Sequence, residues 1–168
     1  AFTMIENSNS PSILYPVTQG ATTTWERYAK VCSLNHFFPG CVTSWFYTDI
    51  LGITHDYKIE NAGYCHFVLQ PTYGGSLTWA KGSYDSASGL IESEWHLSED
   101  GTFTFDCTVP ANTTATVKLP AEASSVVTES GMSLDQNNDD IRFIGYENGR
   151  MCYEVVSGQY HFRVAKGE

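Results

Sequence analysis

The residues best suited to acid–base chemistry lie close together in GATTTWERY, residues 20–28, where Glu26 stands between Trp25 and Arg27. A carboxylate can move a proton or activate water, and an indole can stack on the apolar face of a sugar ring. A guanidinium can hold the charge or orientation of a neighbouring carboxylate. The stretch therefore has the residue types of a carbohydrate site. The alternative is a surface ion pair, which is the commoner role for such neighbours.

A histidine follows ten residues later, in SLNHFFPG, where His36 stands beside Asn35. Imidazole and amide groups can both hydrogen-bond to sugar hydroxyls. A lone histidine among aromatic residues is more often structural. Spacing alone leaves both roles open for His36.

Metal and disulfide chemistry have little support in the sequence. The five cysteines are an odd number, lie far apart and form no Cys-x-x-Cys pair: Cys32, Cys41, Cys65, Cys107 and Cys152. Neither a disulfide framework nor a zinc site of the usual spacing fits this pattern. We expect free thiols that pack as small apolar side chains, and we predict no metal and no cofactor.

Charge and hydropathy argue against two classes of partner. The formal net charge of −10 would repel the phosphate backbone of nucleic acid. The chain has no apolar run of 18 residues and no basic-then-apolar leader at its start, so we predict no membrane segment. The sequence leaves the cellular location unknown.

The first third of the chain predicts a loop and one helix. Residues 1–24 are polar and interrupted by prolines, which is typical of loop and short turns. Residues 42–53 place apolar side chains at steps of three and four, which predicts one amphipathic helix. A single helix cannot close a core, so we expect an exposed apolar patch at 42–53 and self-association through it.

From Gly63 onward the apolar period becomes two. Short β-rich runs are separated by Gly, Pro, Asn or Asp: GYCHFVLQP, SLTWAKGSY, GLIESEWHLS, GTFTFDCTVP, TATVKLP, DIRFIGY, MCYEVV and GQYHFRVA. This pattern predicts a mainly β fold, an antiparallel β-sandwich of jelly-roll type. Residues 121–138 have no clear period and are predicted to be a longer loop.

Several segments, taken in order, resemble the C-terminal end of bacterial α-L-rhamnosidases of glycoside hydrolase family 78. They include PSILYPVTQGATTTWERY, SLNHFFPGCVTSWFYTDILGI and FTFDCTVPANTTATVKLP. The resemblance implies that residues 1–55 are the last segment of an (α/α)₆ catalytic barrel, with the helix at 42–53 left over from it. Residues 56–168 would be the C-terminal β-sandwich domain.

The resemblance also implies roles for particular residues. Glu26 matches the general base of the family, and His36 matches a substrate-pocket residue. Trp25, which has the residue type that stacks on sugars, is the other expected substrate-binding residue. The family hydrolyses terminal α-L-rhamnosyl linkages with inversion, which needs a second carboxylic acid. The acidic motif that supplies this acid has no counterpart in the 168 residues, so we expect the chain alone to be inactive. The implied partners are a rhamnose-containing carbohydrate and the remainder of the barrel.

Two other readings remain. A carbohydrate-binding sandwich without catalysis could present Tyr73, Trp79, Tyr84 and Trp95 as a stacking platform, although Trp79 and Trp95 lie in strand-like runs and are expected in the core. A purely structural sandwich is the third reading. Exposure of two coplanar aromatic rings on one face would favour the binding module.

Overall fold

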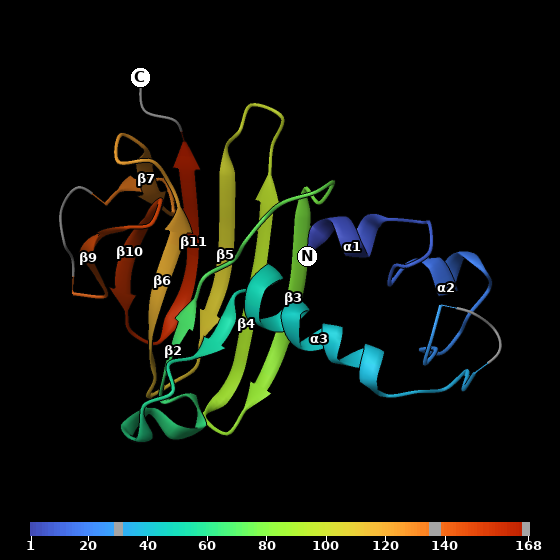
Figure 1. The fold of residues 1–168 in the computed structure, drawn as a ribbon. Coiled ribbons are helices and arrows are strands. Elements are labelled where there is room, and N and C mark those ends of the chain that lie inside the picture. Colours follow the sequence, from blue (N-terminus) through green and yellow to red (C-terminus); the bar gives the residue numbers. More distant parts are fainter. Residues whose placement is uncertain (29–31, 135–138, 166–168) are drawn as a thin grey trace. The chain divides into compact units, whose positions relative to one another are not determined.

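The computed structural model describes residues 1–28, 32–134 and 139–165 (Figure 1). It divides into two compact units. The first comprises Ala1–Phe46 with Gly74–Leu77, and the second comprises Tyr47–Tyr73 with Thr78–Glu168. In the described part of the chain, no helix is long and apolar enough to cross a membrane.

The first unit is built from short helices and loops. Its helices are α1 (Phe2–Glu6), α2 (Tyr15–Thr18), the 3₁₀ turn η1 (Phe38–Cys41) and α3 (Val42–Trp45). The ring of Phe2 meets Trp45 edge-on, with ring centroids 5.1 Å apart. The Glu6 carboxylate accepts hydrogen bonds from the backbone N–H and the hydroxyl of Ser76 at 2.6 and 2.7 Å. These short turns agree with the loop and turns predicted for residues 1–24.

The helix predicted over residues 42–53 is correct at its start and wrong at its end. After α3 the backbone widens into a π-helical turn, η2 (Phe46–Ile50), and Ile53 already begins strand β1. Gly52 makes this change of direction possible because its φ of +72° lies in the left-handed region that favours glycine. Its carbonyl accepts a hydrogen bond from the Gln70 N–H at 2.9 Å, which joins the chain to β2.

The exposed apolar patch predicted for this helix is also wrong for its second half. Ile50, Leu51 and Ile53 are buried. The Ile50 carbonyl accepts a hydrogen bond from the Trp95 indole at 2.8 Å, and the Leu51 carbonyl accepts one from the Ser93 hydroxyl at 2.6 Å. These residues belong to the core of the second unit and offer no surface for self-association.

The second unit is the predicted β-sandwich, which confirms the mainly β fold class. One sheet has the order β1-β2-β6-β10-β9 and the other β3-β4-β5-β11-β7-β8 (Figure 1). All the pairings are antiparallel except β2 with β6. The strands are β1 (Ile53–His55), β2 (His66–Leu69), β3 (Trp79–Ser86), β4 (Gly89–Leu97), β5 (Phe103–Val109), β6 (Thr114–Pro120), β7 (Val126–Glu129), β8 (Met132–Ser133), β9 (Ile141–Glu147), β10 (Arg150–Val155) and β11 (Gly158–Ala165).

The core lies between the sheets and follows the alternation read from the sequence. In β5 and β6 every second side chain is buried: Phe103, Phe105, Cys107, Val109, Ala115, Val117 and Leu119. Successive strand side chains point to opposite faces, so each strand gives one row to the core and one to the outside.

The long loop predicted over residues 121–138 is wrong for its described part. Strands β7 and β8 form there as a narrow hairpin, and residues 135–138 lie outside the described residues. Val127 is buried and pairs with Val164 of β11. Strands of four and two residues are too short to show a period of two in a sequence.

Candidate functional site

The predicted site residues lie in one hairpin of the first unit. Two segments, residues 23–26 and 33–36, run antiparallel and are joined by backbone hydrogen bonds. The His36 N–H donates to the Thr24 carbonyl at 2.8 Å, and the Glu26 N–H donates to the Ser33 carbonyl at 3.0 Å. The structure thus brings Glu26 and His36 onto neighbouring strands of the same hairpin.

The threonines before the tryptophan hold this hairpin closed. The Thr23 hydroxyl donates to the Leu34 carbonyl, and the Thr24 hydroxyl donates to the His36 carbonyl. Threonine suits this task because its branched side chain favours extended backbone while its hydroxyl bonds across the pair. The threonine run therefore has a structural explanation that spacing alone did not supply.

Trp25 and Glu26 differ in their exposure. Trp25 is buried, with 7% of its surface exposed, whereas Glu26 is exposed. The carboxylate also accepts a hydrogen bond from the Ser33 N–H at 3.2 Å, which fixes one oxygen. In the described part of the chain Glu26 forms no ion pair with Arg27, so the surface-pair reading has no support. The geometry offers an accessible carboxylate beside a packed indole.

His36 is half-buried and held on two sides. Its ring stacks on Phe37 with centroids 5.4 Å apart and planes 14° apart. Its Nδ1 accepts a weak hydrogen bond from the Phe38 N–H at 3.4 Å. An accepting Nδ1 belongs to the tautomer that carries its proton on Nε2, which is then a donor.

The described residues contain no group of three or more His, Cys, Asp or Glu side chains that could hold a metal ion. The five cysteines are free thiols, of which Cys107 and Cys152 are buried. Burial raises the pKa of both thiols, which keeps them protonated and unreactive.

The predicted aromatic platform does not exist in the form expected. Trp95 is fully buried, as expected for a core residue, and Tyr73 packs against it. Tyr84 contacts Tyr64 with ring centroids 5.0 Å apart, on the side of β3 that Trp79 does not share. Trp79 is 58% exposed, so its expected burial is wrong. It lies at the start of edge strand β3, where its side of the strand faces outward.

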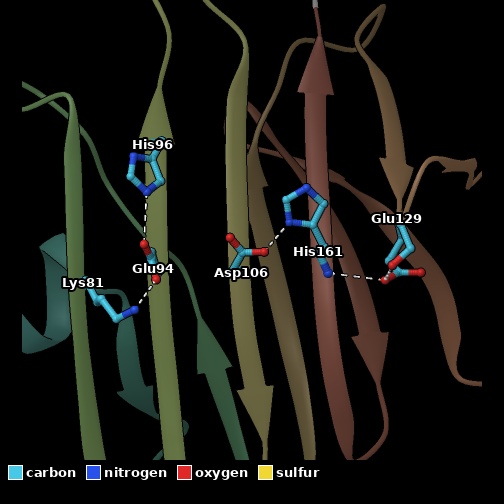
Figure 2. Close-up of polar contacts among 7 residues, drawn as sticks. Lys81, Glu94, His96, Asp106, Glu129 and His161 are labelled. Carbon is cyan, nitrogen blue, oxygen red and sulfur yellow. Dashed lines mark hydrogen bonds and ion pairs between the residues drawn. The ribbon is translucent and has the colours of Figure 1, made fainter.

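A second concentration of polar side chains covers the six-stranded sheet. We call it the outer groove; it has a volume of about 400 Å³ and is lined by strands β3, β4, β5 and β11, with Lys81, Glu92, Glu94, Asp106, Thr108 and His161 among its side chains. Figure 2 shows several of these side chains on one face of the sheet. Sequence reasoning missed it. The available signal was the polar row between the core residues of each strand.

Known proteins match both parts of the chain. Residues 1–50 match the family described as bacterial alpha-L-rhamnosidase 6 hairpin glycosidase domain, and residues 56–133 match the one described as bacterial alpha-L-rhamnosidase C-terminal domain. An alpha-L-rhamnosidase of Streptomyces avermitilis is 31% identical over 98% of this chain and 16% of its own length. One from Alteromonas sp. (strain LOR) is 30% identical over 90% of this chain and 17% of its own length.

Solved structures agree with these matches. The structure of Streptomyces avermitilis alpha-L-rhamnosidase complexed with L-rhamnose aligns with a TM-score of 0.84 and 31% identity, over 98% of this chain and 16% of that one. Alpha-L-rhamnosidase from Dictyoglumus thermophilum aligns with a TM-score of 0.83 and 28% identity, over 96% of this chain and 18% of that one. The chain spans about a sixth of the length of the relatives it matches.

Proposed function

The chain belongs to the bacterial α-L-rhamnosidase family and corresponds to the C-terminal part of its members, and on this premise we propose that it completes a rhamnoside-hydrolysing site. The observation that carries the proposal is the hairpin that presents an exposed Glu26 on the segment paired with the one that carries His36, inside the region that matches the glycosidase domain. In this reading, residues 1–55 are the last segment of a catalytic barrel, and residues 56–168 are the C-terminal sandwich domain.

In the proposed mechanism Glu26 is the general base. Its free oxygen accepts a proton from a water molecule, and that water attacks the anomeric carbon from the face opposite the departing group. The configuration at that carbon is inverted. The Nε2–H of His36 donates to a sugar hydroxyl, and Trp25 holds the hairpin in place and borders the sugar. Because a similar protein is described as complexed with L-rhamnose, the proposed substrate is a terminal rhamnosyl group.

Inversion also requires a protonated carboxylic acid about 6.5–9.5 Å from the base, to protonate the leaving oxygen. The hairpin offers one carboxylate, Glu26. We propose that the acid comes from the longer protein, as the resemblance implies, and that the 168-residue chain alone does not hydrolyse rhamnosides. Loss of a general acid lowers the rate about 10²–10⁴-fold, before any loss of substrate positioning is counted.

Binding is the first test. The isolated chain would be titrated with L-rhamnose while backbone and indole N–H signals are followed by NMR, for the unchanged chain, for Glu26→Gln and for a matched control, Glu99→Gln, in the turn after β4. We expect shifts at Trp25, Glu26 and His36 that disappear in Glu26→Gln and persist in Glu99→Gln. Absence of shifts at the hairpin in the unchanged chain would contradict the proposal.

Catalysis is the second test, and it uses the longer protein that contains this chain. Glu26→Gln should lower kcat for an aryl α-L-rhamnoside about 10²–10⁴-fold with little change in KM, because the base acts in the transition state. NMR of the first product should show the β anomer. An α anomer as first product, or an unchanged kcat in Glu26→Gln, would overturn the assignment of Glu26.

A further inference from the structure

We propose that the outer groove is a second carbohydrate-binding site, which takes an uncharged or positively charged pyranose stacked on Trp79. The site lies wholly within the second unit and does not depend on the role proposed for Glu26. Its polar part comes from β3, β4, β5 and β11. Its aromatic part is Trp79 of β3, which stands beside the groove, two residues before Lys81.

The polar residues form a continuous row across four strands. Strand register places Lys81 opposite Glu94, Glu94 opposite Asp106, and Asp106 opposite His161. Lys81 Nζ donates to Glu94 Oε2 at 2.6 Å, and Asp106 is hydrogen-bonded to His161 Nδ1 (Figure 2). Each side chain is therefore oriented by its neighbour before any ligand arrives, which lowers the entropy cost of binding.

The rows on either side add further hydrogen-bonding groups. His96 Nε2 lies 3.1 Å from Glu94 Oε1 (Figure 2), and the Thr108 hydroxyl donates to Glu92 Oε2 at 2.8 Å. Each carboxylate oxygen has two lone pairs, so these contacts leave acceptor capacity for a ligand. Vicinal sugar hydroxyls offer donors spaced to suit a planar carboxylate. The groove thus presents the acceptors that a polyol requires.

Trp79 supplies the apolar component. Its indole is 58% exposed and lies over His96 with ring centroids 6.3 Å apart and planes 16° apart. Alternation along β3 places it on the same face as Lys81. A broad exposed indole next to fixed polar groups suits a ligand that has one apolar face and a rim of hydroxyl groups, as a pyranose has.

Charge defines the ligand class. Glu92, Glu94 and Asp106 line the groove against one lysine, Lys81, and the Glu129 carboxylate accepts the backbone N–H of His161 at its margin at 3.3 Å (Figure 2). Arg163 lies outside the lining, in the neighbouring row. An anionic sugar would meet this excess of carboxylates, whereas a neutral or amino sugar would not be repelled by it. A volume of about 400 Å³ is at the lower end for small-molecule sites and suits one or two sugar units.

The test follows the four indole N–H signals of the complete chain by NMR during titration with methyl α-L-rhamnoside, methyl glucoside, glucosamine and glucuronate. We expect the Trp79 signal to shift with the first three, and glucuronate to bind at least tenfold more weakly at low salt. The Trp95 signal should stay fixed because that indole is buried and donates to Ile50. Glu26→Gln should leave the Trp79 response unchanged.

Variants separate the site from a general surface effect. Trp79→Ala and the isosteric Asp106→Asn should each weaken binding about tenfold, while Tyr146→Ala, an exposed aromatic residue on β9 of the other sheet, should not. No Trp79 response to any of the neutral or amino sugars would overturn the proposal. So would a response to trilysine without a response to sugars, because that would make the groove a docking surface for a basic peptide.

Discussion

At the scale of single residues, Glu94 couples the outer groove to pH. Hydrogen bonds from Lys81, and then from His96, lower the pKa of its carboxyl below the ordinary 4.5. The same pair raises the pKa of Lys81 above 10.5. A lowered carboxyl pKa contributes stability that is present above about pH 4.5 and is lost as pH falls through the folded-state value. A raised lysine pKa contributes stability that is present below about pH 10.5 and is lost as pH rises further.

Replacing Glu94 with Gln should therefore weaken the pH dependence of the free energy of unfolding at both acidic and alkaline pH. The free energy of unfolding of Glu94→Gln should fall less than that of the unchanged chain between about pH 5 and pH 3, and less above about pH 10. Urea unfolding at a series of pH values measures this, with Glu99→Gln as the control that keeps the Lys81–Glu94 pair. Lys81 is exposed and Glu94 is half-buried at the surface, so the difference should be small and should shrink in salt. Parallel profiles in low salt would show that the pair does not form.

Substitutions of Trp95 and Trp79 should differ in their effect on stability, because the first indole is buried and the second is exposed. The Trp95 side chain is fully buried and its N–H satisfies the Ile50 carbonyl at 2.8 Å. Trp95→Phe leaves that carbonyl without its donor and opens a small cavity, so we expect a loss of about 2–4 kcal/mol in the free energy of unfolding. Trp79→Phe, on the same sheet but exposed, should change it by less than about 0.5 kcal/mol. Equal losses in urea denaturation would place both residues in the core.

These two tryptophans also show what the sequence could not decide. Each lies in a run with strand character, and the period of two was right for both strands. Which face of an edge strand is covered depends on the element that packs against it. That element can be distant in sequence, so the local pattern does not identify the covered face. For Glu26, residue types and spacing indicated a carbohydrate site. Its hairpin partner, Ser33, and the pairing of His36 with Thr24 came only with the structure.

At the scale of elements, the turn at Gly52 directs the chain from helix to sheet. A Cβ at this position would lie 2.1 Å from the backbone carbon of Gln70, and the residue has a φ of +72°. Gly52→Ala must therefore move backbone as well as adopt a strained dihedral angle. We expect a loss of several kcal/mol, or failure to fold.

Gly131 provides the matched control, because it has a φ of +81° and an added Cβ there would meet nothing within 4 Å. Gly131→Ala should cost only the dihedral strain, about 1 kcal/mol. Comparison of the two urea midpoints isolates the clash at Gly52. If both variants lost the same free energy, the close approach of Gly52 to Gln70 would have to be relieved without cost.

Element boundaries explain most of the difference between the predicted and observed folds. All eight predicted β-rich runs contain strands, because a period of two over six or more residues is a strong local signal. Strands β1, β7 and β8 were missed because they are short and, unlike the equally short β2, do not lie within a longer β-rich run. In the sequence, apolar side chains continue at helix-like steps as far as Ile53 by chance, although the chain itself turns at Gly52. The turn depends on contact with β2, whose Leu69 pairs with Ile53 across 16 residues of sequence.

At the scale of the whole molecule, the two units differ in how they are stabilised. Among the described residues of 1–46, the buried ones are Ser12, Pro16 and Trp25. The second unit buries both inner faces of a sandwich, with Phe67, Phe105 and Phe162 fully covered. No composition or periodicity argument divides the chain into these units or assigns the first to a catalytic barrel. That assignment came from the resemblance, and the domain boundary at residue 55 stays a prediction.

The uneven burial leads to a prediction for the chain as a whole. A variant that consists of residues 47–168 keeps the entire sandwich and should fold with nearly the same urea midpoint and slope as the full chain, because both quantities follow the apolar surface buried on folding. Circular dichroism and fluorescence of Trp95 would follow unfolding, with Trp95→Phe in the shortened chain as a check that the same core is reported. A free energy of unfolding lowered by much more than about 1 kcal/mol would mean that residues 1–46 stabilise the sandwich directly. An unchanged midpoint would mean that the sandwich is equally stable without residues 1–46. Those residues would then be available to form part of a site in a longer protein.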